Sequence, residues 1–383
     1  MKRVLIFSLT YMPLIGGAEV AIKEITDRLG HDDDFEWDLI TLRPNTNMPK
    51  FENIGNVNVY RVGLFSNQST DLVRKDFFFN LNKLLFPLGA CIKAVFLNRE
   101  KKYNAVWSIM AAYAGLAGLF FKFFNPKTKF ILTLQEGDTS GYVKNKAGIF
   151  VFLIKKIFTK ADYIHAISNY LVNFAKDFGC KKKVIVIPNG VDLSKFKAQS
   201  TKLNSSRNRI ITTSRLIEKN GIRDLILSLK YLRDDFILDI LGTGPLYNDL
   251  IRITNDNNLS QRVFFRGGLG QEEMIRYINN ADVFVRPSLS EGLGNSFLEA
   301  MAVGLPIIAT KVGGIPDFLI DKETGLFCQV NNPRDIAEKI IMINTDFVLR
   351  NKLIMNGKKL IENQYGWGII VKKFKLEIFD KIG

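Results

Sequence analysis

Two glutamates frame a glycine-rich stretch of the sequence, Glu291-Gly292-Leu293-Gly294-Asn295-Ser296-Phe297-Leu298-Glu299. The apolar run 281–285 predicts a buried strand before it, and a helix is expected to begin near Asn295. A strand, a glycine turn and a helix start present backbone N–H groups and a positive dipole end to an anion. Glu291 would face the bound group, and Glu299, a helical turn deeper, could grip ribose-like hydroxyls. The alternative is a solvated loop acid and a first-turn acid that complements the helix dipole.

Two cations occupy the equivalent place earlier in the second half of the chain. Arg215 and Lys219 follow the apolar run 209–213 and precede a helix expected from Ile222. They suit a diphosphate whose negative charge grows as a bond breaks. The alternative is that they are surface charges, with Lys219 paired to Glu218 or Asp224.

Three further post-strand turns could approach a ligand. Gly16-Gly17 opens the first predicted helix, where backbone amides could meet a phosphate. Gly242-Thr243-Gly244 follows a strand, and Arg266-Gly267 ends another, where backbone groups could contact a base. Each of these turns could equally be a local connection.

Strand-like and helical patterns alternate along the whole chain, and the alternation restarts after residue 208. Strands are expected at 4–9, 37–42, 57–62, 105–109, 130–134, 163–167, 184–187, 209–213, 236–241, 263–265, 282–285 and 306–309. This rhythm predicts parallel sheets with crossover helices, and the polar segment 188–208 suits a domain boundary. The fold class is therefore α/β, with two doubly wound, Rossmann-like domains facing each other across a cleft. We expect domains at 1–190 and 191–365.

Composition excludes several classes of protein. The 383 residues include only three cysteines, widely spaced, which supports neither a disulfide framework nor a cysteine-based metal site. His31 and His165 are far apart, and the acidic run 32–34 is expected to be solvated. No metal or other cofactor is therefore expected. No run reaches the eighteen or so apolar residues of a membrane span, and the short apolar start does not suit an export signal.

Six motifs together resemble the retaining glycosyltransferases of family 4, which have the GT-B fold. In order, they are Gly16-Gly17-Ala18-Glu19, Pro188-Asn189-Gly190-Val191-Asp192, Arg215-Leu216 with Lys219, Gly242-Thr243-Gly244-Pro245-Leu246, Glu291 with Glu299, and Gly313-Gly314-Ile315-Pro316. The resemblance covers nearly the whole chain. It implies transfer of a sugar from a UDP- or GDP-sugar to a glycan or lipid-linked acceptor, with retention at the anomeric carbon and without a metal.

The resemblance also assigns roles to residues. Arg215 and Lys219 would hold the donor diphosphate, assisted by the Gly16 and Gly17 amides. Glu291 would contact the donor sugar and Glu299 the ribose. The remaining donor-binding residues would be Gln135, Asn220, Gly242, Arg266, Gly292, Leu293, Gly294, Asn295 and Ser296. The terminal helix, 366–383, would cross back onto the first domain.

Two positions depart from the family pattern. Gln135 stands where many relatives have a histidine that contacts the donor sugar, so a proton-transfer role is excluded there. Relatives often place the lysine directly before the glycine, whereas here Asn220 separates Lys219 from Gly221. These departures motivate one alternative, a catalytically silent sugar-nucleotide-binding or scaffold protein. Another alternative is a sugar-nucleotide epimerase of the same architecture, which would need no acceptor.

Positive charge and phenylalanine concentrate in residues 72–160. This segment has fifteen Lys or Arg against four acids, and thirteen of the thirty phenylalanines. A helix burying Phe and Leu while showing Lys could lie in an anionic membrane surface. The rival is a core helix with a solvated basic face, and no recognition motif supports nucleic acid as a partner. We expect a cytoplasmic enzyme at the inner face of the membrane, acting in surface polysaccharide or glycolipid synthesis.

Overall fold

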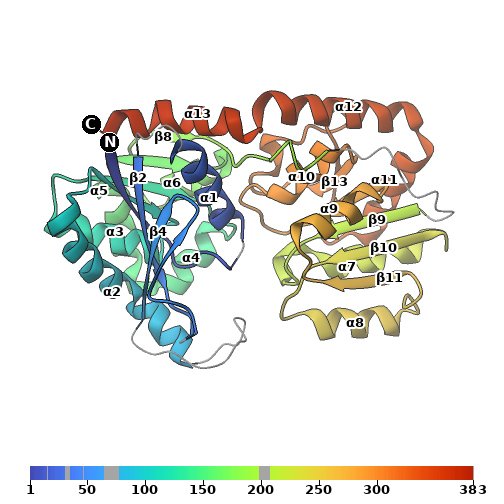
Figure 1. Cartoon of the computed structure of the whole chain (residues 1–383). Helices are drawn as coiled ribbons and strands as arrows, with labels where there is room; N and C mark the ends of the chain where they lie inside the picture. Colours follow the sequence, from blue (N-terminus) through green and yellow to red (C-terminus); the bar gives the residue numbers. More distant parts are fainter. Residues whose placement is uncertain (15, 31–34, 46, 64–76, 198–207, 383) are drawn as a thin grey trace. The chain divides into compact units, whose positions relative to one another are not determined.

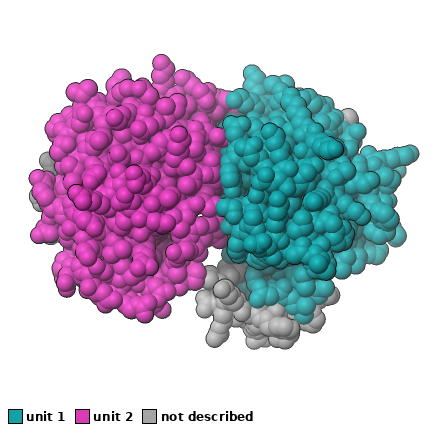
Figure 2. Space-filling model, turned by 180° about the vertical axis from the view of Figure 1, so that it is seen from behind, with its two compact units in different colours: residues 1–189, 370–383 teal, residues 190–369 magenta. Residues whose placement is uncertain are grey.

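The computed structural model describes residues 1–14, 16–30, 35–45, 47–63, 77–197 and 208–382 (Figure 1). It contains two compact units: unit 1 comprises residues 1–189 and 370–383, and unit 2 comprises residues 190–369 (Figure 2). The chain thus divides at 189/190, next to the boundary expected at 190/191. His31, the acidic run 32–34, residues 72–76 and residues 198–207 of the predicted linker lie outside the described residues.

Unit 1 is built on an eight-stranded sheet with the order β3-β4-β2-β1-β5-β6-β7-β8. The strands are β1 (Lys2–Phe7), β2 (Phe35–Leu42), β3 (Phe51–Ile54), β4 (Val57–Val62), β5 (Ala105–Ile109), β6 (Lys129–Leu134), β7 (Tyr163–Ala166) and β8 (Val184–Val186). All neighbours are parallel except β3 and β4. Central strands are buried on both faces, which explains their near-continuous apolar sequences.

Helices cover both faces of this sheet. They are α1 (Gly17–Gly30), α2 (Phe77–Lys101), α3 (Tyr113–Phe124), α4 (Ser140–Ala147), α5 (Val151–Lys160) and α6 (Asn169–Asp177). In Figure 1, α2 and α3 lie side by side, and α2 also contacts β1, β2 and β4. The C-terminal segment contains α13 (Trp367–Glu377) and a 3₁₀ turn (Phe379–Ile382). Phe374 packs on Trp107 and Phe379 on Trp37, so residues 370–382 belong to the core of unit 1.

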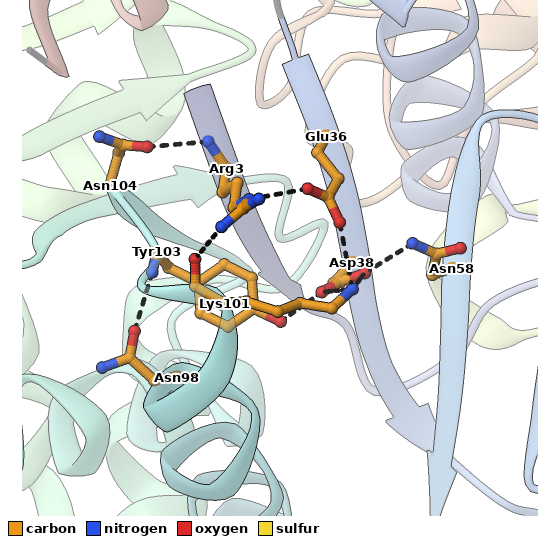
Figure 3. A network of polar contacts seen from close by, with 8 residues as sticks. All are labelled: Arg3, Glu36, Asp38, Asn58, Asn98, Lys101, Tyr103 and Asn104. Atoms are coloured by element: carbon orange, nitrogen blue, oxygen red, sulfur yellow. Dashed lines mark hydrogen bonds and ion pairs between the residues drawn. The ribbon is translucent and has the colours of Figure 1, made fainter. Parts of the chain in front are cut away.

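A polar network fastens the end of α2 to this sheet (Figure 3). Asp38 on β2 is fully buried and accepts hydrogen bonds from Lys101, Tyr103 and Asn58. Lys101 also pairs with Glu36. The lysine charge therefore compensates a carboxylate that would otherwise be costly to bury.

Unit 2 is built on a six-stranded parallel sheet with the order β11-β10-β9-β12-β13-β14. The strands are β9 (Asn208–Thr213), β10 (Phe236–Leu241), β11 (Val263–Gly267), β12 (Val283–Arg286), β13 (Ile307–Thr310) and β14 (Leu326–Cys328). The helices are α7 (Ile222–Ser228), α8 (Tyr247–Asp256), α9 (Gln271–Asn279), α10 (Asn295–Val303), α11 (Pro333–Thr345) and α12 (Phe347–Gln364). Ile210, Leu225, Leu238, Val285 and Ile308 lie in one buried core cluster.

Helix α2 is apolar on average, although no run of eighteen apolar residues occurs in it. Residues 79–101 of α2 form one helix that is long and apolar enough to cross a bilayer, by length and composition. Part of that helix nevertheless packs inside unit 1 against the sheet and α3. We therefore treat α2 as an element of the fold.

Candidate functional site

The carboxyl ends of β9 and β12 meet where the sheet of unit 2 changes direction. From β9 the chain moves outward through β10 and β11, and it then returns to place β12, β13 and β14 on the other side. Open α/β sheets bind ligands at such a switch point, beyond the carboxyl ends of the strands. Arg215, Lys219 and Asn220 follow β9, and residues 291–299 follow β12. These predicted residues therefore flank the switch point.

The loop after β9 and the loop after β12 are in direct contact. The backbone N–H of Leu289 donates to the carbonyl of Lys219 at 2.7 Å. Gly221 has a φ of +67°, and a Cβ there would lie 1.9 Å from the carbonyl oxygen of Pro287. Only glycine permits this approach of two backbones. The structure thus brings the cation-bearing loop against the glutamate-bearing loop.

The three polar residues of the first loop have different environments. Arg215 is exposed, Lys219 is half-buried and Asn220 is buried. The Asn220 amide nitrogen donates to the carbonyl of Arg215 at 2.6 Å. Asn220 thereby closes the loop on itself, and Arg215 and Lys219 provide the positive charge of this loop.

Arg286, the last residue of β12, connects the parts of the site. Its side chain is only 7% exposed. Nη1 donates to the carbonyl of Thr213 at 3.2 Å and to Oγ of Ser296 at 2.6 Å, while Nη2 pairs with the Glu291 carboxylate. The guanidinium also lies over the Phe297 ring, 4.3 Å from its centroid. One buried cation therefore ties the end of β9, the glutamate loop and the start of α10 together.

Glu291 is held through both its side chain and its backbone. Besides pairing with Arg286, its carboxylate accepts a hydrogen bond from the N–H of Gly292 at 3.0 Å. Its carbonyl accepts from the N–H of Gly314 at 3.1 Å, and a Cβ on Gly313 would lie 1.8 Å from that oxygen. A carboxylate has about four acceptor positions. Glu291 is thus fixed in direction and keeps acceptor capacity for ligand hydroxyls.

The start of α10 requires the glycine before it. Gly294 has a φ of +91°, and a Cβ there would lie 2.8 Å from Nη2 of Arg286. Asn295 and Ser296 begin the helix, whose first N–H groups have no partners within the helix. Leu293 is 1% exposed, so its side chain belongs to the core and only its backbone could reach a ligand.

Glu299 lies one turn into α10, where the positive charge of Arg286 acts on its carboxyl group. Burial raises the pKa of the Glu299 carboxyl to about 7, and the charge of Arg286 opposes part of that rise. Burial lowers the pKa of Arg286, and Glu291 and Glu299 oppose that shift. The ionisation of Glu299 therefore changes near neutral pH.

The remaining predicted residues of unit 2 lie on neighbouring strands. Gly242 has a φ of +140°, and a Cβ there would lie 1.9 Å from the carbonyl oxygen of Ser214. Its N–H donates to the carbonyl of Gly267 at 2.7 Å. The Arg266 guanidinium donates to the buried carboxylate of Asp239 at 2.7 Å. The Arg266 side chain is thus held inside unit 2.

Gly16 and Gly17 stand at the beginning of α1 in unit 1. Glu19, in the first turn, is 7% exposed and accepts a hydrogen bond from the hydroxyl of Thr10. A Cβ on Gly16 would lie 2.6 Å from a carboxylate oxygen of Glu19. The predicted anion-binding turn therefore already has a carboxylate of the protein beside it.

Gln135 and Glu136 follow β6 at the carboxyl edge of the unit 1 sheet. Gln135 accepts a hydrogen bond from the Asn189 amide at 3.3 Å. Glu136 accepts one from the N–H of Ala111 at 2.5 Å, and its Oε2 is buried with no hydrogen-bond partner. Burial raises the pKa of Glu136 to about 7. Glu136, to which sequence reasoning gave no role, is therefore a buried carboxyl with a raised pKa beside Gln135.

Comparison with known proteins identifies the family. A model for glycosyltransferase family 4 matches residues 15–195, and a model for glycosyl transferases group 1 matches residues 194–360. The chain belongs to glycosyltransferase family 4. This glycosyltransferase is 27% identical to an uncharacterized glycosyltransferase of Methanocaldococcus jannaschii, over 99% of the chain and 98% of the relative.

A second relative has a named reaction. A GDP-mannose-dependent monoacylated phosphatidylinositol monomannoside mannosyltransferase of Corynebacterium glutamicum is 30% identical, over 57% of the chain and 62% of the relative. A relative from Staphylococcus aureus, 29% identical over 75% of the chain and 79% of the relative, is named for capsular polysaccharide biosynthesis. The glycosyltransferase activity class is thereby established, among relatives that make glycolipids and polysaccharides.

A solved structure confirms the fold. Anabaena HepE in complex with UDP-glucose matches with a TM-score of 0.81 at 16% identity, over 99% of the chain and 100% of HepE. The predicted fold class, two Rossmann-like α/β domains of the GT-B type, and the family resemblance are both confirmed.

Proposed function

We propose that this glycosyltransferase moves a sugar from a UDP- or GDP-sugar to a lipid-linked or glycan acceptor, with retention at the anomeric carbon and without a metal. The main support is the contact, at the switch point of unit 2, between the Arg215–Lys219 loop and the loop that bears Glu291. This arrangement combines cations, helix N–H groups and a fixed carboxylate at one sheet edge. Such a combination suits a nucleotide diphosphate linked to a hydroxyl-rich sugar.

Each group has a role in this proposal. Arg215 and Lys219 neutralise the diphosphate, assisted by the positive end of the α10 dipole. Glu291 accepts hydrogen bonds from the donor sugar and Glu299 from the ribose. Arg286 is a positioning residue, because it acts on the donor only through Glu291 and the start of α10.

The chemistry follows from where charge develops. Breaking the anomeric bond leaves positive charge on the sugar ring and adds negative charge to the departing phosphate. Cations already placed at that phosphate stabilise the transition state more than the ground state. The departing phosphate then accepts the proton of the acceptor hydroxyl, which attacks from the same face and so retains configuration. Among the described residues, no three His, Cys, Asp or Glu side chains gather to hold a metal ion, and metal independence remains a prediction.

The residues of unit 1 complete the proposal. Gln135 donates or accepts a hydrogen bond at the donor sugar, and the Gly16 and Gly17 amides assist at the phosphate. Donor classes are suggested by the relatives, one named for GDP-mannose and a fold neighbour bound to UDP-glucose. We place the enzyme in the cytoplasm at the inner face of the membrane, without a nucleic acid partner.

The test is turnover of a panel of UDP- and GDP-sugars, with the anomeric configuration of the product read by NMR. We expect a product that retains the donor's configuration, in the presence or absence of EDTA. Lys219→Met should lose turnover, while Lys230→Met, which removes an exposed lysine bonded to Asn257, should keep it. An inverted product, or full turnover by Lys219→Met, would contradict the proposal.

A further inference from the structure

Helix α2 has two apolar faces, and only one of them packs against the rest of unit 1. Its buried face includes Phe86, Ala90, Ala94 and Leu97, at 2%, 0%, 0% and 8% exposure. Its other face shows Leu84, Leu88, Ile92 and Phe96, at 66%, 53%, 59% and 58% exposure. Residues four apart lie on one face of a helix, so these four form a continuous stripe, which we name the α2 stripe. The sequence-based expectation of a helix that shows mainly lysine was therefore incomplete.

Exposed apolar side chains continue beyond both ends of the α2 stripe. Phe123 and Phe124, at the end of α3, are 82% and 66% exposed. The ends of α2 and α3 are joined, because the Asn98 amide donates to the side-chain oxygen of Asn125 at 2.8 Å. At the other end, burial and then the charge of Lys146, in the last turn of α4, lower the pKa of Lys83, which stands next to Leu84. Ile149 and Phe150 follow α4 directly and are 82% and 60% exposed. Contiguous exposed apolar side chains of this kind mark an interaction surface.

The segment of the chain that carries this surface is basic. Residues 77–160 contain thirteen Lys or Arg and three acids. Two of those acids, Glu136 and Asp138, lie in the segment between β6 and α4. Lys146, Lys155 and Lys156 are exposed beside the apolar residues of η1 (Gly148–Phe150) and α5. Apolar side chains surrounded by lysines match an anionic lipid surface, which offers negative headgroups above an apolar layer.

We propose that the α2 stripe, together with Phe123 and Phe124 of α3 and Ile149 and Phe150 of η1, enters the headgroup layer of an anionic membrane. This proposal rests on the proposed function in one respect, since docking would bring the enzyme to a lipid-linked acceptor. A second copy of the chain is a poorer occupant, because two such basic surfaces would repel each other. The helix lies in the surface, since its other face is buried in unit 1.

The experiment compares vesicles of phosphatidylcholine with vesicles that also contain phosphatidylglycerol, at low and high salt. We expect the protein to sediment with the anionic vesicles and to remain partly bound at high salt, because apolar insertion is not screened. The stripe variant Leu88→Ser/Ile92→Ser leaves the charge unchanged and should weaken binding about tenfold or more. Phe347→Ser/Val348→Ser removes two exposed apolar residues of unit 2, at 68% and 82% exposure, and should bind like the wild type.

Three results would overturn the proposal: indifference to vesicles, binding unaffected in the stripe variant, or a wild-type dimer that the stripe variant converts to monomers. Equal melting temperatures of wild type and variants check folding, since the substituted side chains are exposed. Turnover of the donor sugar, measured without vesicles, should be unchanged in the stripe variant. If the wild type shows no turnover but binds vesicles through the stripe, the transferase proposal fails and the docking proposal stands.

Discussion

Replacement of Arg286 by methionine tests the part of the site that sequence reasoning missed. The substitution keeps an apolar side chain of similar length but removes the donors to Glu291, Ser296 and the carbonyl of Thr213. Removing one partner of a buried ion pair costs about 3–5 kcal/mol, because the other charge stays buried and unpaired. Since the Glu291 side chain keeps 18% exposure, we expect the lower end, about 3 kcal/mol.

Hydrogen exchange of the α10 amides is the direct assay of this effect. A loss of about 3 kcal/mol would raise the local opening equilibrium roughly a hundredfold. Arg350→Met is the matched control, because Arg350 meets Asp282 at 3.5 Å in a more exposed pair whose loss should cost below about 1 kcal/mol. Adding Glu291→Gln to Arg286→Met should recover part of the loss. Unchanged exchange in α10 of Arg286→Met would refute the positioning role.

Three further predictions concern buried carboxyl groups. The Michaelis constant for the donor should fall as pH rises through about 7, because ionised Glu299 accepts ribose hydroxyls better, and Glu299→Gln should remove this dependence. Glu136→Gln should stabilise unit 1 by up to about 3 kcal/mol above pH 7, because the buried carboxyl that it replaces is costly to ionise. The gain should be small below pH 4.5, where this carboxyl is protonated in both the folded and the unfolded state. Urea unfolding followed by tryptophan fluorescence measures the free energy of unfolding. Less stability gain at high pH than at low pH would contradict it. Asp38→Ala should lower the free energy of unfolding by about 3 kcal/mol in the same assay, because Lys101 then keeps only Glu36 as an ion-pair partner. A change below about 1 kcal/mol would show that the buried network contributes little to stability.

The strands were predictable where burial makes their sequences apolar. The bounds predicted for β4, β5 and β10 are those observed. β3 was missed because its residues, Phe-Glu-Asn-Ile, are exposed or half-exposed on an antiparallel edge and lack an apolar run. β14 was missed because its apolar run is only Leu326-Phe327-Cys328, whereas the run around the equally short β8 extends to Ile187. Local pattern thus identified the buried strands and missed one edge strand of each sheet.

Motif spacing identified the loops of the site but could not assign partners to side chains. The contact between Gly221 and Pro287 depends on strand order, which no local pattern contains. Sequence reasoning gave Arg286 no role in the site, although a cation five residues before Glu291 was the available signal. The partner of the Arg266 side chain could not be predicted for the same reason, since Asp239 lies on the neighbouring strand. The α2 stripe could not be predicted, because composition does not tell which of two apolar faces of a helix is buried.

Nucleotide binding by variants that lack the Arg215 or the Lys219 charge tests the central claim most directly. Titration calorimetry with UDP and GDP would compare wild type with Arg215→Met, Lys219→Met and the control Lys230→Met. Since hydrogen bonds to charged groups contribute about 1.5–3 kcal/mol, each of the first two variants should bind the preferred nucleotide about tenfold or more weakly. The control should match the wild type. Wild-type affinity in both Arg215→Met and Lys219→Met would show that the diphosphate is not bound at this switch point.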